Sequence, residues 1–377
     1  MSIRRMVKRA VTAALLVGAL VPSLPAQKPV KTKDAAKLAK DSVKMAKAAK
    51  DSGTVGRFFR SETPLAMTLT LNIKRIKGDK GDNQPWRTAT LSYAAVAPDT
   101  GTVKIPLRVK TRGIWRLKNC EFPPIWLNFT GEAVKGTEFK GLDEVKLTSY
   151  CRNNDEYEHY ILSELQLNRA LRLLTPISHA VRAVKVTYVD SASGKTEATR
   201  WGFFQEEPLT LAGRLNGRIL KQQGAGPDDL DPYQSALMGV FEYFVGNTDF
   251  SVAALHNVEL LGLNNGISVY PVAHDFDFSG AVNAKYATTP PQLPIHSVRD
   301  RLYRGYCAPP EEFAKVFALF NAKKDSIYGL YRDPVGKLLP EDVTKHTLEY
   351  FDDFYKTINN PKDAKSDIIQ RCLGGKA

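Results

Sequence analysis

The stretch VGNTDFSVAALHN occupies residues 245–257, and YPVAHDFDFSG follows at residues 270–280. The segments VELLGL (residues 258–263) and GISVYPVA (residues 266–273) predict a tight β-hairpin. Gly246 and Asn247 predict the end of the preceding helix, because both residue types tolerate the left-handed backbone conformation. One loop–strand–strand–loop unit is thus expected to carry four polar side chains: Asp249, Asn257, Asp275 and Asp277.

These four residue types match the needs of metal-dependent phosphoryl transfer. That reaction uses a carboxylate at the acceptor hydroxyl, and an amide oxygen and a carboxylate on a Mg²⁺ ion that neutralises the phosphates. Hard oxygen ligands suit this ion. The structural alternative is that the same aspartates only form turns.

Residues 61–207 are predicted to be rich in β-strands. From Met67 onward, apolar and polar residues alternate in segments that are separated by turn-forming residues. The expected strands lie in MTLTLNIKRI, RTATLSYAAV, TVKIPLRVKTRG, PPIWLNF, DEVKLTSY, HAVRAVKVTYVD and TRWGFFQEE. Residues 154–174 instead repeat apolar side chains at three- and four-residue steps, which predicts a helix with its N-cap at Asn154 or Asp155.

A lysine and a glutamate in this region predict an ion pair. Lys146 lies on the last strand before the helix, and Glu164 lies on the inward face of the helix. An inward carboxylate is costly unless it is paired. In kinase-like folds a strand lysine that contacts nucleotide phosphates is held by a helix glutamate in this order. The alternative is a solvent-facing Lys146 and a charge at the rim for Glu164.

Residues 208–377 are predicted to be mainly helical. The segment DPYQSALMGVFEYFV begins with Asp231 as N-cap and Pro232 as the first helical residue. Two later amphipathic helices are expected in PEEFAKVFALFNAKKDSIYGLY and PEDVTKHTLEYFDDFYKTI. A β-rich first half and a helical second half predict an α+β protein with two lobes and a cleft between them.

The N-terminal residues predict export. Residues 1–26 combine a basic start with an apolar run, as in a signal peptide, and the Lys/Ala-rich residues 27–60 predict a disordered linker. No later stretch is long and apolar enough for a membrane helix, so stable membrane insertion after signal cleavage is not expected. We therefore expect a secreted protein, or one in the periplasm or cell envelope.

The net charge of +13 is unevenly distributed. Residues 1–26 carry +4 and residues 27–60 carry +7, which leaves +2 for residues 61–377. Because nucleic-acid binding needs a basic face on the folded domain, no nucleic-acid partner is expected. Four cysteines in an oxidising compartment permit two disulfides. We expect Cys120–Cys151 and Cys307–Cys372, because the two cysteines of each pair lie in the same predicted part of the chain.

The pattern N-x-D-x7-N, followed by a hairpin and then His-D-x-D-x-x-G, resembles the CotH kinases of spore coats, a family of atypical secreted protein kinases. It is more distantly similar to the HipA and phosphoinositide-kinase groups. An Arg-Gly element (Arg112-Gly113) and a Glu-rich strand end (FFQEE) follow the same order. The resemblance covers about residues 100–285. It departs from the family where a Lys-Lys pair is usual and CEFPPIWLNF stands instead.

The resemblance implies an atypical kinase-like fold with a β-rich N-terminal lobe and a helical C-terminal lobe that carries the catalytic and metal loops. It implies that Asp249 orients the acceptor hydroxyl and that Asn257 and Asp275 bind Mg²⁺ (or Mn²⁺), with Asp277 behind them or on a second metal ion. ATP is the implied phosphate donor, with Lys146 and Glu164 at the nucleotide and Lys118 as the alternative lysine at the phosphates. The implied activity transfers the ATP γ-phosphate to Ser/Thr hydroxyls of a protein substrate outside the cytoplasm.

Two other functions remain open. A non-catalytic binding or adhesion module, a degenerate kinase, would use the same acidic loops for Ca²⁺, since carboxylates and amides suit that ion as well. A metallohydrolase would instead use His256 and His274 beside the aspartates.

Overall fold

A computed structural model describes residues 55–95 and 100–374. The predicted signal peptide, and the predicted linker up to residue 54, lie outside these residues. The described part belongs to one compact unit. Within it, α2 (Arg57–Arg60) lies in the tract that we expected to be a linker, but Phe58 and Phe59 are buried in the core of the β-strands.

Seven strands form a closed barrel in the order β1-β2-β3-β4-β5-β7-β6. The barrel closes because β1 pairs in parallel with β6, from Leu65 opposite Val184 to Leu71 opposite Asp190. Buried and more exposed residues alternate along β1, as expected for a strand with one face on the core. The strands are β1 (Leu65–Leu71), β2 (Arg87–Ala94), β3 (Thr102–Thr111), β4 (Ile125–Asn128), β5 (Glu144–Thr148), β6 (Val181–Asp190) and β7 (Thr196–Gln205).

The remaining strands form a separate sheet in the order β10-β9-β8. These are β8 (Gly217–Leu220), β9 (Val258–Leu263) and β10 (Val269–Ala273), and the predicted hairpin is confirmed as the antiparallel β9–β10 pair. The helices after α2 are α3 (Ile73–Gly78), α4 (Trp115–Asn119), α5 (Asp155–Leu174), α6 (Pro208–Arg214), α7 (Pro232–Val245), α8 (Pro310–Gly329), α9 (Glu341–Asn359) and α10 (Pro361–Asp367).

The prediction of a two-lobed kinase-like fold is wrong. The structure has a closed seven-stranded barrel, a helical C-terminal region and a small sheet. Alternating polarity indicates where strands form, but it does not say which strands pair. The β1–β6 pairing joins segments that are more than a hundred residues apart, and this pairing turns an open sheet into a barrel.

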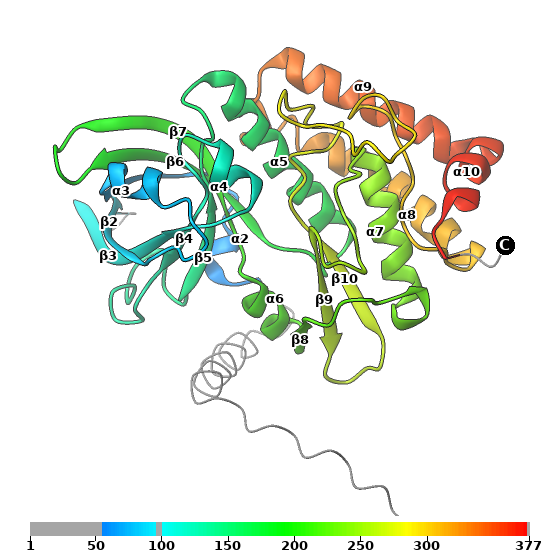
Figure 1. The fold of residues 1–377 in the computed structure, drawn as a ribbon, viewed down its shortest axis with the longest axis horizontal. Helices are drawn as coiled ribbons and strands as arrows, with labels where there is room; N and C mark the ends of the chain where they lie inside the picture. The colour runs from blue at the N-terminus through cyan, green and yellow to red at the C-terminus, as the bar shows by residue number, and fades with distance from the viewer. Residues whose placement is uncertain (1–54, 96–99, 375–377) are drawn as a thin grey trace, which may run out of the picture. The chain divides into compact units, whose positions relative to one another are not determined.

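Helix α5 lies between the barrel and the other helices. It packs on β6 and β7 on one side and on α8 on the other, and Figure 1 shows the barrel strands on one side of α5 and α7, α8 and α9 on the other. Of the two predicted N-cap candidates, Asn154 and Asp155, the structure has Asn154, whose side chain accepts a hydrogen bond from the Tyr157 N–H. Asp231 caps α7 in the same way. Good caps and apolar faces explain why both helices were predictable.

Both predicted disulfides are formed. Cys120 is bonded to Cys151, and Cys307 is bonded to Cys372. Disulfides form and persist in oxidising compartments, so the two bonds indicate an extracellular or otherwise oxidising environment. Among the described residues, no helix has the length and apolar character needed to cross a bilayer.

Candidate functional site

The β9–β10 hairpin brings two of the predicted metal ligands to one end of the small sheet. Asn257 immediately precedes β9, and Asp275 follows β10. The backbone N–H of His274 donates to the carbonyl oxygen of Asn257 at 3.1 Å, so the two loops lie side by side. Both residues are partly buried and have positive φ angles, 53° for Asn257 and 66° for Asp275. Such angles are uncommon outside glycine and often mark functional sites.

Asp249 lies next to Asn257. Helix α7 ends at Gly246 with φ 69°, as predicted, and this turn leads directly to Asp249. The Asn257 side-chain amide donates to the Asp249 carbonyl oxygen at 2.7 Å and to Asp249 Oδ2 at 3.1 Å. The amide nitrogen is therefore committed to Asp249, so a ligand bound by the Asn257 side chain would meet its amide oxygen.

His256 pairs with the other oxygen of Asp249. Its Nε2 lies 2.9 Å from Asp249 Oδ1, and the side chains are 48% and 35% exposed, so the pair is open to solvent. A carboxylate beside an imidazole is an arrangement suited to moving a proton. From the sequence we had placed His256 only in the metallohydrolase alternative, so its contact with Asp249 was missed.

A pocket of about 490 Å³ opens at this pair. Helix-flanking residue Ile114, which is 77% exposed, contributes from the barrel side. Arg304 contributes a guanidinium that donates to the Thr248 carbonyl oxygen and so holds the Asp249 loop. The lining residues are Ile114, Thr248, Asp249, Phe250, Ser251, Ala254, Leu255, His256, Pro290, Gln292 and Arg304.

Asp277 belongs to a buried charge network rather than to the open pocket. Arg116, on α4, contacts Glu164 Oε2 at 2.5 Å and Asp277 Oδ2 at 3.0 Å. The Tyr286 hydroxyl donates to the same Asp277 oxygen at 3.1 Å. Asp277 Oδ2 thus has two donors within the protein. Arg116 is a residue that sequence reasoning missed, because nothing in the segment WRLKN distinguishes it from a surface arginine.

The network separates the pKa values of its carboxyls. Burial raises the pKa of Asp277 well above its usual value, and neighbouring Asp275 adds to this effect. Burial also raises the pKa of Glu164, despite Arg116. For Asp275, burial acts upward but is outweighed by Arg116 and other cations, so the pKa is lowered. Asp275 is therefore the carboxyl of this group that favours its charged form.

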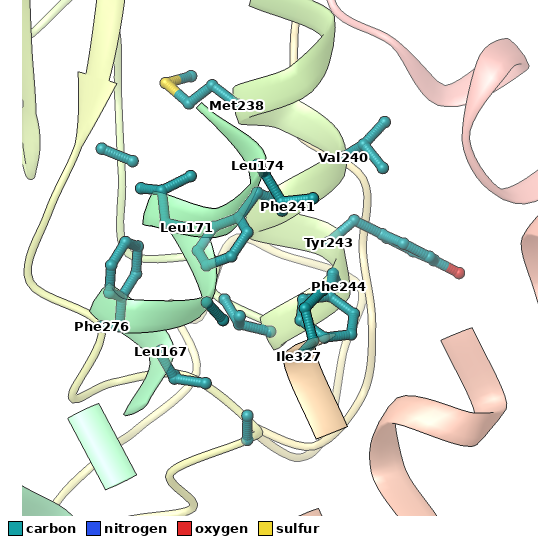
Figure 2. Close-up of a cluster of buried hydrophobic side chains, with 14 of the residues drawn as sticks. Leu167, Leu171, Leu174, Met238, Val240, Phe241, Tyr243, Phe244, Phe276 and Ile327 are labelled. Carbon is teal, nitrogen blue, oxygen red and sulfur yellow. The ribbon is translucent and has the colours of Figure 1, made fainter. Parts of the chain in front are cut away.

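Phe276 anchors the two aspartates between which it lies. Its side chain is fully buried and packs edge-on against Phe241 of α7, with ring centroids 5.3 Å apart. Figure 2 shows Phe276 turned into the apolar cluster with Leu167 and Leu171 of α5. Because the middle residue is held in the core, the flanking Asp275 and Asp277 are fixed relative to the helices.

The expected Lys146–Glu164 pair is not formed. Lys146 Nζ instead lies 3.7 Å from Glu259 Oε1, and Glu164 pairs with Arg116. Both predicted residues are buried, at 7% and 3% exposure. The helix that carries Glu164 presents it to α4, while the register of β5 turns Lys146 toward β9. A sequence order cannot distinguish these two partners.

Glu259 is the centre of a second polar cluster. His179 Nε2 lies 3.0 Å from Glu259 Oε2, in a contact that is poorly aligned for a hydrogen bond, and His274 Nε2 lies 3.8 Å from Oε1. Burial would raise the pKa of Glu259, but His179 and Lys146 outweigh it, so the pKa is lowered. Burial lowers the pKa of His274 to about 4. His274 is therefore neutral at physiological pH.

Within residues 55–95 and 100–374, no group of three or more His, Cys, Asp or Glu side chains is placed to hold a metal ion. Of the predicted ligands, Asn257 and Asp275 are the two whose loops are joined by a backbone hydrogen bond. Comparison with models of known protein families finds no match for this chain. A comparison with curated proteins finds no match either.

Proposed function

We propose that the protein is a secreted phosphotransferase similar to the CotH kinases in its reaction, which moves the γ-phosphate of ATP to a Ser/Thr hydroxyl of a protein with Mg²⁺ or Mn²⁺. The observation that carries the proposal is the position of Asn257. Its amide nitrogen holds Asp249, and its backbone bonds the loop of Asp275. Asn257 thus connects the proposed general base, Asp249, to the loop of the proposed metal ligand Asp275.

Asp249 is proposed as the group that accepts the proton of the acceptor hydroxyl. It is partly exposed in a pocket, it is held by Asn257, and it contacts His256. A general base must be reachable and fixed in direction, and Asp249 meets both conditions. The pocket volume of about 490 Å³ accommodates a side chain with its neighbouring backbone.

Asn257 and Asp275 are proposed to hold the metal ion. Both are partly buried, and Asp275 favours its charged form. Mg²⁺ is commonly bound by one or two protein oxygens plus phosphate oxygens and water, so two ligands fit this ion. When bound, the ion would neutralise charge on the phosphates. Asp277 fits a supporting role, since Arg116 and Tyr286 both donate to it.

Cationic side chains beside Asp275 favour a polyanionic ligand. The Arg112 guanidinium is partly buried, donates to the Thr148 hydroxyl at 3.0 Å, and has an Nε atom without a hydrogen-bond partner among the described residues. Burial lowers the pKa of Arg112 to about 10, which reflects the cost of holding its charge there. A phosphate oxygen would reduce that cost. Lys146 is proposed to approach the phosphates from β5, with Glu164 acting only indirectly through Arg116.

A second candidate function is nucleotide binding without transfer. It is favoured by the contact of Lys146 with Glu259, because a lysine whose charge is already partly neutralised gives less stabilisation to the phosphoryl group during transfer. This reading keeps the same pocket and the same metal ligands, but it predicts that Asp249 is dispensable for binding.

The test is transfer of radiolabelled phosphate from ATP by the exported protein, with Mg²⁺ or Mn²⁺, to itself and to Ser/Thr peptides. We expect transfer by the wild type, loss in Asp249→Asn with retained ATP-dependent thermal stabilisation, and loss of both in Asp275→Ala. Asp82→Asn, on an exposed barrel loop, is the matched control. Nucleotide stabilisation without transfer would favour the second candidate. Absence of both effects in the wild type would contradict the proposal.

A further inference from the structure

Glu242 is a buried carboxyl group that the proposed reaction does not use. It lies in the last turn of α7, is 1% exposed, and neither of its carboxyl oxygens has a well-formed hydrogen bond within the described part of the chain. Its neighbours in the helix, Phe241, Tyr243 and Phe244, belong to the buried hydrophobic cluster that Figure 2 shows in close-up. A carboxyl in such surroundings is costly unless a polar group faces it.

Asn247 is the polar group that faces Glu242. It is also 1% exposed, and its side-chain nitrogen has no well-formed hydrogen bond among the described residues. The Asn247 amide opposes the rise that burial causes in the pKa of the Glu242 carboxyl, so these two groups without well-formed hydrogen bonds are neighbours. Their backbones are joined as well, since the Asn247 N–H donates to the Glu242 carbonyl oxygen at 2.8 Å.

The other end of the Asn247 side chain reaches the proposed catalytic loop. Asn247 Oδ1 accepts the backbone N–H of Asp249 at 3.0 Å. The amide of Asn247 is planar, so its oxygen and nitrogen cannot move independently. A group that holds the Asn247 amide nitrogen therefore also orients the amide oxygen that accepts the Asp249 N–H.

We propose that Glu242 is a positioning residue whose buried carboxyl holds the Asn247 amide and thereby fixes the Asp249 loop. This inference rests on the proposed function of Asp249 for its effect on catalysis, but not for its effect on the loop. Glu242 is not among the residues that line the pocket, and its proposed effect on the position of the loop runs through Asn247.

The charge state of Glu242 provides a signature of this role. Burial raises its pKa from 4.5 to about 8, Asn247 opposes the rise, and Asp249 is the charged group whose field adds to it. The folded protein therefore keeps the proton that the unfolded chain releases near pH 4.5. The stability that comes from the neutral carboxyl is complete below that pH and is lost as the pH rises through about 8.

The experiment compares Glu242→Gln, which keeps the shape and a hydrogen-bonding oxygen but cannot ionise, with Glu242→Leu, which removes the polar partner. The exposed Glu349→Gln on α9 is the control. Three properties are measured between about pH 5 and about pH 9: the melting temperature, hydrogen–deuterium exchange of residues 246–257, and phosphate transfer.

When the pH is raised, we expect the melting temperature of Glu242→Gln to fall less than that of the wild type. Near neutral pH, hydrogen exchange of residues 246–257 should be like that of the wild type. Glu242→Leu should raise exchange in residues 246–257 and lower kcat by about 100-fold with little change in KM for ATP, because the Asp249 carboxylate is misplaced. Asn247→Ala should raise exchange in the same way.

A purely structural role predicts a different result. Glu242→Leu would then change stability without changing loop exchange or the kcat of transfer, and that outcome would overturn the inference. If the wild type transfers no phosphate but Glu242→Leu and Asn247→Ala both loosen residues 246–257, the proposed function fails while the positioning role stands. If transfer occurs and neither variant affects the loop, the positioning role fails alone.

Discussion

The protein contains two clusters of charged side chains, and the clusters differ in their exposure to water. The side chains of Arg116, Glu164 and Asp277 are 9%, 4% and 5% exposed, and every one of them is paired within the protein. The Asp249 and His256 side chains are 35% and 48% exposed and border a pocket. The first group is sealed by α4, α5 and the loop after β10, whereas the second lies at an open turn after α7.

This difference in exposure distinguishes charged residues that stabilise the fold from charged residues that are available for chemistry. A charge sealed among partners is costly to leave unpaired, so its loss is felt by the whole fold. An exposed carboxylate beside an imidazole contributes little to stability, but it is available to a substrate. The variants below test whether this division holds.

The largest effect on stability is expected from Arg116→Met. The substitution leaves Glu164 and Asp277 buried without their cation, which should cost about 3–5 kcal/mol of unfolding free energy. Equilibrium urea unfolding measures this loss. The triple variant that also carries Glu164→Gln and Asp277→Asn should recover part of it, because the uncompensated charges are then removed. A loss below about 1 kcal/mol would show that the network is not sealed in solution.

Asp249→Asn is expected to have the opposite profile. Its unfolding free energy should stay within about 1 kcal/mol of the wild type, since the side chain is open to solvent. Phosphate transfer should fall by about 10²–10⁴-fold, the usual contribution of a general base. Parallel measurements of unfolding and transfer check both parts. Destabilisation as large as that of Arg116→Met would mean that Asp249 is a structural residue.

The smallest effect is expected from Lys285→Ala. Lys285 pairs with Glu156 on the surface beside the sealed network, with side chains that are 71% and 44% exposed. Water and salt screen such a pair, and holding two long side chains in place costs entropy, so the melting temperature should not change measurably. A clear decrease at low salt that disappears at high salt would instead reveal a contribution from this surface pair.

Local structure was largely predictable from the residues. The caps Asn154 and Asp231 and the turn at Gly246 were identified correctly, and so were both disulfides. One local error is instructive. The segment MTLTLNIKRI was expected to be one strand, but β1 ends at Leu71 and α3 follows, because the Asn72 side chain accepts the Arg75 N–H and starts a helix.

The candidate site was predictable only in part. The hairpin placed Asn257 and Asp275 together as the spacing required, because residues that flank a tight hairpin must meet at its open end. Arg116, however, reaches Asp277 from a segment far away in the sequence, and Lys146 and Glu259 are also far apart along the chain. No periodicity links such residues, so the expected partner of Lys146 was wrong and Arg116 was missed.

The sequence by itself determined the long helices α5, α7, α8 and α9, most strands, the hairpin and the cysteine pairs, since these depend on propensities, caps and short loops that act between near neighbours. Only the tertiary structure decided that β1 meets β6 and closes the barrel, that Glu164 pairs with Arg116, and that Asp277 is sealed while Asp249 stays open. Those outcomes depend on which distant surfaces exclude water from one another, and burial of this kind sets the energy of every charge at the site.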